Sequence, residues 1–130
     1  MPLSSAGEPM TSTSPIIDFH AHIYFDPDEV EVARALATEA ASRFDLQVGR
    51  FHLQPVGPHP RGSCQLTVRT AEFGAFAQWL TLNRSSLTIF AHANTGDDWL
   101  DHTRHVIWFG PSETLNSAFF DRLLASRARD

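Results

Sequence analysis

Residues 19–25 alternate strictly between two kinds of side chain, and this pattern restricts the fold of the chain more than any other feature. The apolar positions are Phe19, Ala21, Ile23 and Phe25, and the positions between them hold His20, His22 and Tyr24. Successive side chains of a β-strand point to opposite faces, so a period of two predicts a strand with one face against a core. The two histidines and the tyrosine therefore share the face that points away from the core.

Helix and strand patterns follow in the order of a split βαβ fold. Asp26 is a suitable N-cap with Pro27 at the first helical position, and an apolar stripe carries this helix to about Arg43. The next patterns predict strands over 46–54, with a bulge at Gly49, and over 63–70, then a helix over 71–83 and a strand over 87–92. The order β-α-β-β-α-β predicts an α+β, ferredoxin-like antiparallel sheet with helices on one face.

The C-terminal part predicts a short strand and a final helix. Residues 93–102 are polar and are expected to form a loop, residues 105–109 form the strand, and Ser112 caps a helix whose apolar face includes Leu115, Phe119 and Leu123. Residues 1–14 are rich in Ser, Thr and Pro, and we expect a disordered leader there. Residues 15–127 are expected to form a single domain, because 130 residues suffice for one core.

Charge and cysteine content exclude several classes of function. The net charge is −5 and the chain has no lysine, which argues against a nucleic-acid partner, since phosphate binding needs clustered basic residues. Cys64 is the only cysteine, so neither an intrachain disulfide nor a thiolate metal cluster can form. No apolar run approaches the length of a membrane span. These features predict a cytoplasmic protein with neither a nucleic-acid nor a membrane partner.

Seven histidines are present, and His20 and His22 form the most informative pair. Two residues apart on a strand, they point the same way with α-carbons roughly 6.5–7 Å apart. That separation lets two imidazoles reach one metal ion, which needs metal–nitrogen bonds of ~2.1 Å. The same spacing is also typical of two half-exposed polar residues on a strand, so the pair alone leaves both interpretations open.

The remaining histidines occur in different contexts. His59 lies between two prolines, which favours a rigidly held ligand or acid/base group but also suits a turn whose imidazole faces water. His92 ends a predicted strand, a position from which site residues often reach. His102 follows Asp101, whose carboxylate can orient an imidazole if the fold brings the side chains into contact. His52 is interpreted as polar lining of the sheet.

The polar face of the predicted sheet needs a cover that one small domain hardly provides. A second subunit could supply it, so we expect a homodimer. Arg69 lies on this face and could pair with a substrate carboxylate, although it could equally be a solvated strand residue. Tyr24 and Trp108 are expected to line the same pocket. Cys64 falls on the core face, where a thiol is usually inert.

Several blocks of sequence together resemble the DOPA 4,5-dioxygenase family. In the family's order, they are Phe19-His20-Ala21-His22-Ile23-Tyr24-Phe25, Val56-Gly57-Pro58-His59-Pro60, His92-Ala93-Asn94-Thr95-Gly96, Asp101-His102 and Trp108-Phe109-Gly110. They cover about residues 17–111. The resemblance implies a ferredoxin-like fold, often dimeric, that cleaves a catechol ring in extradiol fashion with O2 and a non-haem metal. Ala93 departs from the proline expected after the strand-end histidine.

The resemblance also implies roles for individual residues. The metal, expected to be Fe(II) although another divalent ion could replace it, would lie among His20, His22, His59 and His92. His102 would be the acid/base group, steadied by Asp101, and the substrate pocket would include Tyr24, Arg69 and Trp108. The substrate would be DOPA, caffeate or a similar catechol, opened to a semialdehyde.

Two questions stay open at the level of sequence. The usual iron site has two histidines and a carboxylate. No carboxylate here has a clear claim to be the third ligand, so an all-histidine site and a carboxylate from another loop are both possible. The alternative function is a metal-free or catalytically silent ferredoxin-like dimer that binds a small aromatic compound.

Overall fold

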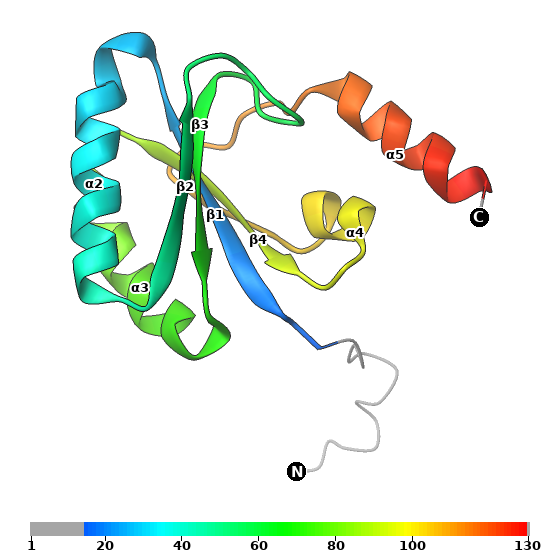
Figure 1. Ribbon diagram of the computed structural model, residues 1–130. Coiled ribbons are helices and arrows are strands. Elements are labelled where there is room, and N and C mark those ends of the chain that lie inside the picture. The colour runs from blue at the N-terminus through cyan, green and yellow to red at the C-terminus, as the bar shows by residue number, and fades with distance from the viewer. Residues whose placement is uncertain (1–14, 130) are drawn as a thin grey trace.

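The computed structural model describes residues 15–129, and the expected leader over 1–14 lies outside the described residues. A five-stranded antiparallel sheet with the order β2-β3-β1-β4-β5 forms its centre (Figure 1). The strands are β1 (Asp18–Phe25), β2 (Leu46–His52), β3 (Gly62–Val68), β4 (Thr88–Asn94) and β5 (Val106–Phe109). The first four have the order of a split βαβ fold, which confirms the predicted α+β, ferredoxin-like class. Strand β5 extends the sheet beside β4.

Helices cover both faces of this sheet. A 3-10 turn, η2 (Pro27–Glu29), leads into α2 (Val30–Arg43), and α3 (Thr70–Asn83) lies beside α2 on the same face. Two further helices, α4 (Asp98–Thr103) and α5 (Ser117–Arg129), lie on the opposite face (Figure 1). The two crossover helices therefore occupy one face as predicted, and the C-terminal helices partly cover the other.

The hydrophobic core lies between the sheet and the first helix pair. Alternate residues of β1 are fully buried there and pack against Leu36 and the small residue Ala40 of α2, and against Phe76 and Leu80 of α3. Each large side chain removed from water in this way contributes roughly 1.5–3 kcal/mol to folding. Cys64 belongs to the same core, and burial raises the pKa of its thiol to about 11, which suits an inert thiol.

A β-bulge interrupts strand β2, as the glycine at position 49 predicted. The pairing of β2 with β3 shifts between Val48 and Phe51. Beyond the shift, Phe51 lies opposite Cys64, and His52 lies opposite Ser63. The extra residue thus directs the Phe51 side chain toward the core and His52 toward the opposite face of the sheet.

Two predictions about the C-terminal part are wrong in detail. The polar segment 93–102 is not all loop, because Asp97 caps α4 by accepting the backbone N–H of Leu100 at 3.1 Å. The last helix begins at Ser117 rather than after Ser112, and the Asn116 side chain accepts the N–H of Ala118 at 2.9 Å. The helix α4 has only 6 residues, too few for a periodic pattern to reveal it in the sequence.

One negative finding concerns membranes. Within residues 15–129, no helix combines the length and the apolar character that crossing a bilayer requires.

Candidate metal centre

Three histidines meet on the face of the sheet that points away from α2 and α3. His20 and His22 come from β1, and His92 comes from the adjacent β4, directly opposite His20 in the register. One ring nitrogen of each lies within 4.8 Å of the others, so the three could hold a metal ion. His22 and His92 are buried, and His20 is half-buried. Strand pairing therefore brings together residues that are far apart in the sequence.

The geometry of His22 and His92 suits two ligands of one ion. Their Nε2 atoms lie 3.1 Å apart. Two nitrogens that are each ~2.1 Å from an ion, at a right or tetrahedral angle, are roughly 3.0–3.4 Å apart. The Nδ1–H of His92 donates to the Ala93 carbonyl oxygen at 3.0 Å, which leaves the Nε2 lone pair of His92 free. Metal-bound histidines usually make such a bond with their second nitrogen.

Electrostatics favour the neutral imidazoles that metal binding requires. Burial lowers the pKa of His22 well below its ordinary value, and the neighbouring imidazoles lower it further. Burial likewise lowers the pKa of His92 to about 4. His20 has a pKa lowered by burial, although Asp18, with Oδ1 at 3.3 Å from Nε2, opposes that shift. The donor set therefore fits a divalent cation that accepts nitrogen ligands.

His59 lies beside this group and has a different partner. Its Nδ1 is 2.7 Å from the hydroxyl oxygen of Tyr24, and its ring centroid is 4.1 Å from that of His22. Burial raises the pKa of Tyr24, so the hydroxyl keeps its proton and can donate it to Nδ1. Burial also lowers the pKa of His59 to about 3. If Nδ1 accepts this hydrogen bond, a neutral His59 carries its own proton on Nε2 and can donate a hydrogen bond from there.

Ion pairs hold the loop that carries His59. The Arg61 guanidinium lies 2.6 Å from the Glu113 carboxylate and 3.1 Å from that of Asp26. The backbone N–H of Asn116 donates to the Pro58 carbonyl at 2.8 Å. The loop is thus tied both to the start of the first helix and to the segment before α5, so His59 is presented from a fixed backbone.

His102 reaches the group from α4. Its ring centroid is 4.3 Å from that of His92 and 5.4 Å from that of Phe119 in α5. Its Nδ1–H donates to the Asp98 carbonyl at 2.7 Å, so the Nε2 lone pair is free. This residue was singled out by sequence, and the fold does bring it to the histidine group.

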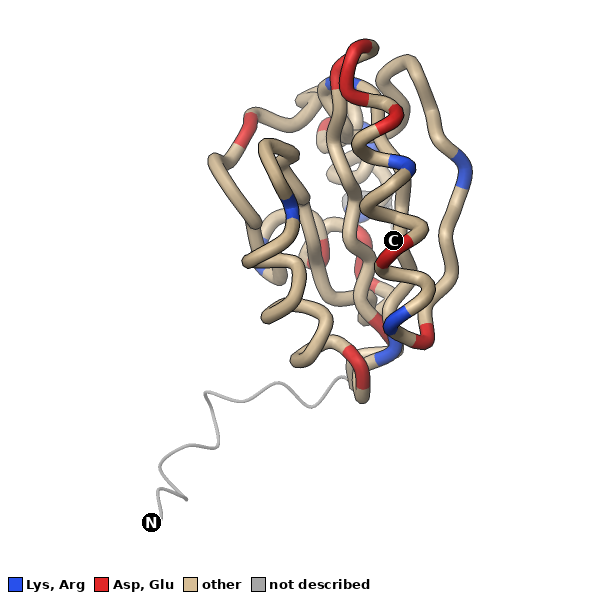
Figure 2. Tube along the Cα trace, turned by 90° about the vertical axis from the view of Figure 1, so that its left-hand side faces the viewer, with Lys and Arg blue, Asp and Glu red and all other residues tan. Residues whose placement is uncertain are grey.

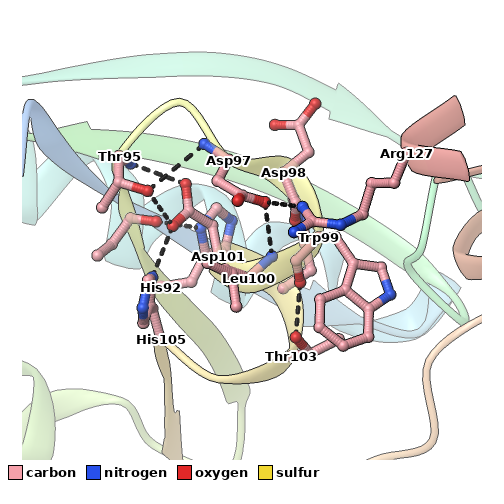
Figure 3. Close-up of polar contacts among 12 residues, drawn as sticks. His92, Thr95, Asp97, Asp98, Trp99, Leu100, Asp101, Thr103, His105 and Arg127 are labelled. Atoms are coloured by element: carbon pink, nitrogen blue, oxygen red, sulfur yellow. Dashed lines mark hydrogen bonds and ion pairs between the residues drawn. The ribbon is translucent and has the colours of Figure 1, made fainter. Parts of the chain in front are cut away.

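Asp101 does not steady His102, and that expectation is wrong. The Asp101 carboxylate accepts hydrogen bonds from the Thr95 backbone N–H at 2.7 Å, the Thr95 hydroxyl at 2.7 Å and His105 Nδ1 at 2.8 Å (Figure 3). Neighbouring residues of a helix point in different directions, whereas residues four apart share a face. Asp101 therefore clamps the end of β4 to the start of β5.

The three residues predicted to line a substrate pocket are placed differently from one another. Tyr24 and Trp108 lie together beside Phe90, with Phe90 and Trp108 ring centroids 4.7 Å apart. Arg69 follows the end of β3 and pairs with Asp45 at 2.8 Å, with both side chains largely exposed. Arg69 is thus committed to the surface near α3 and does not join the histidine group.

A cavity of about 350 Å³ opens beside the group, and sequence patterns did not reveal it. It lies between strands β2 and β3 and the loop of His59. Its lining includes His22, Arg50, His52, His59, Gln65 and Thr67. Arg50 was overlooked because, although a bulge at Gly49 was predicted, the sequence does not show to which face the residue after the bulge points.

Comparison with known proteins decides the family. A family model described as the Dopa 4,5-dioxygenase family matches residues 19–119. The chain belongs to this family. The matched range contains all three histidines of the group, together with His59 and His102, so the site described above lies within the part of the chain that defines the family.

Individual relatives agree with this assignment. An uncharacterized 21.2 kDa protein from Botryotinia fuckeliana is 34% identical over 85% of the chain, and the match covers 67% of that protein. The DOPA 4,5-dioxygenase of Amanita muscaria is 34% identical over 81% of the chain, which spans only 50% of that enzyme. A crystal structure from Nostoc punctiforme, described as a candidate dioxygenase, has a TM-score of 0.82 and 38% identity, covering 87% of this chain and 98% of its own.

Proposed function

We propose that this protein is a metal-dependent extradiol dioxygenase that opens the ring of a catechol. The observation that carries the proposal is the pair of buried nitrogens, His22 Nε2 and His92 Nε2, 3.1 Å apart, with a nitrogen of His20 within 4.8 Å. Membership of the Dopa 4,5-dioxygenase family supports the reaction class. Both atoms of O2 enter the product of such a reaction, so one O2 is consumed per ring opened and no external reductant is needed.

The three histidines would hold the metal, which we propose to be Fe(II). When bound, this ion supplies Lewis-acid and redox chemistry and open positions for the catechol oxygens and O2. The grouping of ligand atoms, taken over residues 15–129, contains three histidines and no carboxylate. Of the two possibilities that the sequence left open, this supports the all-histidine site.

We assign the roles of proton acceptor and hydrogen-bond donor to two further histidines. His102 presents a free Nε2 lone pair, which suits it to accept a proton from a catechol hydroxyl. His59 carries its proton on Nε2, because its Nδ1 accepts from Tyr24, and it can donate a hydrogen bond to an oxygen of the substrate or intermediate. The opposite tautomers of these two rings are the basis for assigning one as base and the other as donor.

The aromatic side chains around the group restrict access by water. Phe90 is buried, and its ring lies 6.2 Å from that of His102 and 4.7 Å from that of Trp108. The ring of Phe119 in α5 also lies near that of His102, with centroids 5.4 Å apart. Flat apolar surfaces suit an aromatic ring, and the exclusion of water strengthens hydrogen bonds to the reacting oxygens.

Oxygen uptake tests the proposal. Purified protein is freed of metal with a chelator, loaded with Fe(II) under anaerobic conditions, and mixed with catechols and O2. We expect one O2 consumed per catechol and a yellow ring-opened product, with the Zn(II)-loaded protein as the redox-inert control. Protein that binds iron stoichiometrically but consumes no O2 with any of several catechols would overturn the enzymatic function.

A further inference from the structure

The cavity beside His22 and His59 lies against the sheet, where the paired strands β2 and β3 form one wall and the loop of His59 contributes another. Its volume of about 350 Å³ is near the lower end of small-molecule sites, which suits a single-ring compound. Most of its lining side chains are polar, as at Gln47, Gln65 and Thr67. Because His22 and His59 line the cavity, a substituent of a catechol ring held at the histidine group could extend into this space.

The β2 bulge places Arg50 in the cavity. In a regular strand, position 50 would share a face with Val48 and His52, whereas here the pairing shifts between Val48 and Phe51. Gly49 allows the shift, because a Cβ at that position would lie 3.1 Å from the Gln65 carbonyl oxygen. Arg50 therefore lines the same cavity as His22 and His59.

Arg50 is also the cationic side chain of this cavity. Its lining contains no lysine and no other arginine. Arg61 and Arg69 are engaged by carboxylates. Within residues 15–129, none of the ion pairs involves Arg50. No acidic residue lines the cavity, so the guanidinium charge is uncompensated there.

We propose that Arg50 is a specificity-determining residue that binds a carboxylate substituent of the substrate. This inference rests on the proposed function, because it places the catechol ring at the histidine group. A guanidinium matches the planar geometry of a carboxylate and can bind it through two parallel hydrogen bonds. The cavity then selects catechols with an anionic side chain over neutral or cationic ones.

The kinetic experiment compares catechols whose side chains are anionic, neutral or cationic. The probes are 3-(3,4-dihydroxyphenyl)propionate, 4-methylcatechol and dopamine, with the Fe(II)-loaded wild type and the variant Arg50→Gln. We expect the variant to lose about tenfold in kcat/KM for the carboxylate, mainly through a higher KM. A partly exposed, charge-assisted pair strengthens binding by about that factor. The kcat/KM for 4-methylcatechol should change less than twofold.

Two further variants sharpen the comparison. Arg43→Gln removes a surface arginine that pairs with Glu39 on α2 and serves as the matched control. Arg50→Glu should favour dopamine over the carboxylate. The assignment of Arg50 would be overturned if Arg50→Gln lost kcat/KM equally for the charged and neutral probes, or lost none for either.

A binding measurement separates this inference from the proposed function. Calorimetry with the Zn(II)-loaded protein measures the affinity for the same carboxylate and for 4-methylcatechol without turnover. We expect the preference for the carboxylate to fall about tenfold in Arg50→Gln and to weaken with added NaCl. If the two proteins differ in this preference but the Fe(II)-loaded wild type consumes no O2, the role of Arg50 is supported and the dioxygenase activity is rejected. An unchanged preference in the variant would reject the role of Arg50 whatever the activity.

Discussion

His22 and His92 face each other across two neighbouring strands, with their Nε2 atoms 3.1 Å apart. Two arrangements account for this short distance. Either one proton is shared between the two rings, or one cation is bound by the Nε2 lone pairs of both. The hydrogen bond from His92 Nδ1–H to Ala93 and the burial that keeps both rings neutral favour a cation site. Most of the protein's expected chemistry depends on this pair.

Removing either histidine of the pair should abolish stoichiometric metal binding. His22→Ala and His92→Ala each delete one nitrogen from a group of three, and two remaining ligands hold a divalent ion only weakly. Metal content after dialysis, measured by atomic emission, checks this. His52→Ala, on the same face but outside the group, should retain the metal. Full retention in both ligand variants would show that the ion binds elsewhere.

Tyr24→Phe should affect His59 without affecting the metal. The substitution keeps the ring and removes the 2.7 Å hydrogen bond to Nδ1, leaving a buried nitrogen without its partner. We expect a loss of about 1–3 kcal/mol in the free energy of unfolding and a lower kcat at nearly constant KM. Urea denaturation and steady-state kinetics measure the two effects. Loss of metal from this variant would mean that His59 is itself a ligand.

Asp101→Asn should destabilise the fold, because Asp101 is a structural clamp. Its buried carboxylate accepts three hydrogen bonds from Thr95 and His105, and an amide cannot accept all three (Figure 3). We expect a loss of roughly 1–3 kcal/mol, measured by urea denaturation. Asp98→Asn is the matched control on the same helix, where the side chain is exposed, and should stay within about 0.5 kcal/mol of the wild type. Equal stability of the two variants would contradict the clamp.

The metal-free protein should lose stability as the pH falls below about 6.5. Burial lowers the pKa of His59 to about 3 and that of His92 to about 4, from an ordinary value of 6.5. Between the folded and unfolded values, the unfolded chain binds protons that the folded chain excludes. The stabilisation is therefore complete above 6.5 and falls by about 1.4 kcal/mol per pH unit for each histidine.

Urea midpoints at pH 7.5, 6.0 and 5.0, with a chelator present, measure this dependence. His59→Gln removes a histidine with a lowered pKa, so the urea midpoint of this variant should fall less steeply with decreasing pH. A midpoint that does not change between pH 7.5 and 5.0 would mean that these imidazoles are protonated in the folded protein as easily as in the unfolded chain.

Charged residues of both signs are distributed along the chain. Figure 2 shows acidic and basic positions interspersed along the chain trace rather than gathered into one basic stripe. The expectation that the protein has no nucleic-acid partner stays a prediction from the charge of the sequence. The expected homodimer stays a prediction, which the molar mass from light scattering tests.

The sequence by itself determined the sheet and the faces of its central strand. Alternation over 19–25 assigned Ala21, Ile23 and Phe25 to the core and His20 and His22 to the opposite face, and the structure has them there. A pattern with a period of two encodes this directly, because near neighbours alone decide which side of a strand meets the core. The family resemblance, carried by short blocks of sequence, was likewise confirmed.

Only the tertiary structure decided which side chains meet. The partner of His22 is 70 residues away in the chain, and Asp101 pairs with His105 rather than with its neighbour His102. The bulge in β2, not the strand pattern, brought Arg50 to the cavity and left Arg69 outside it. Such contacts depend on strand register and on the direction of each side chain, and these are fixed only when the whole core packs.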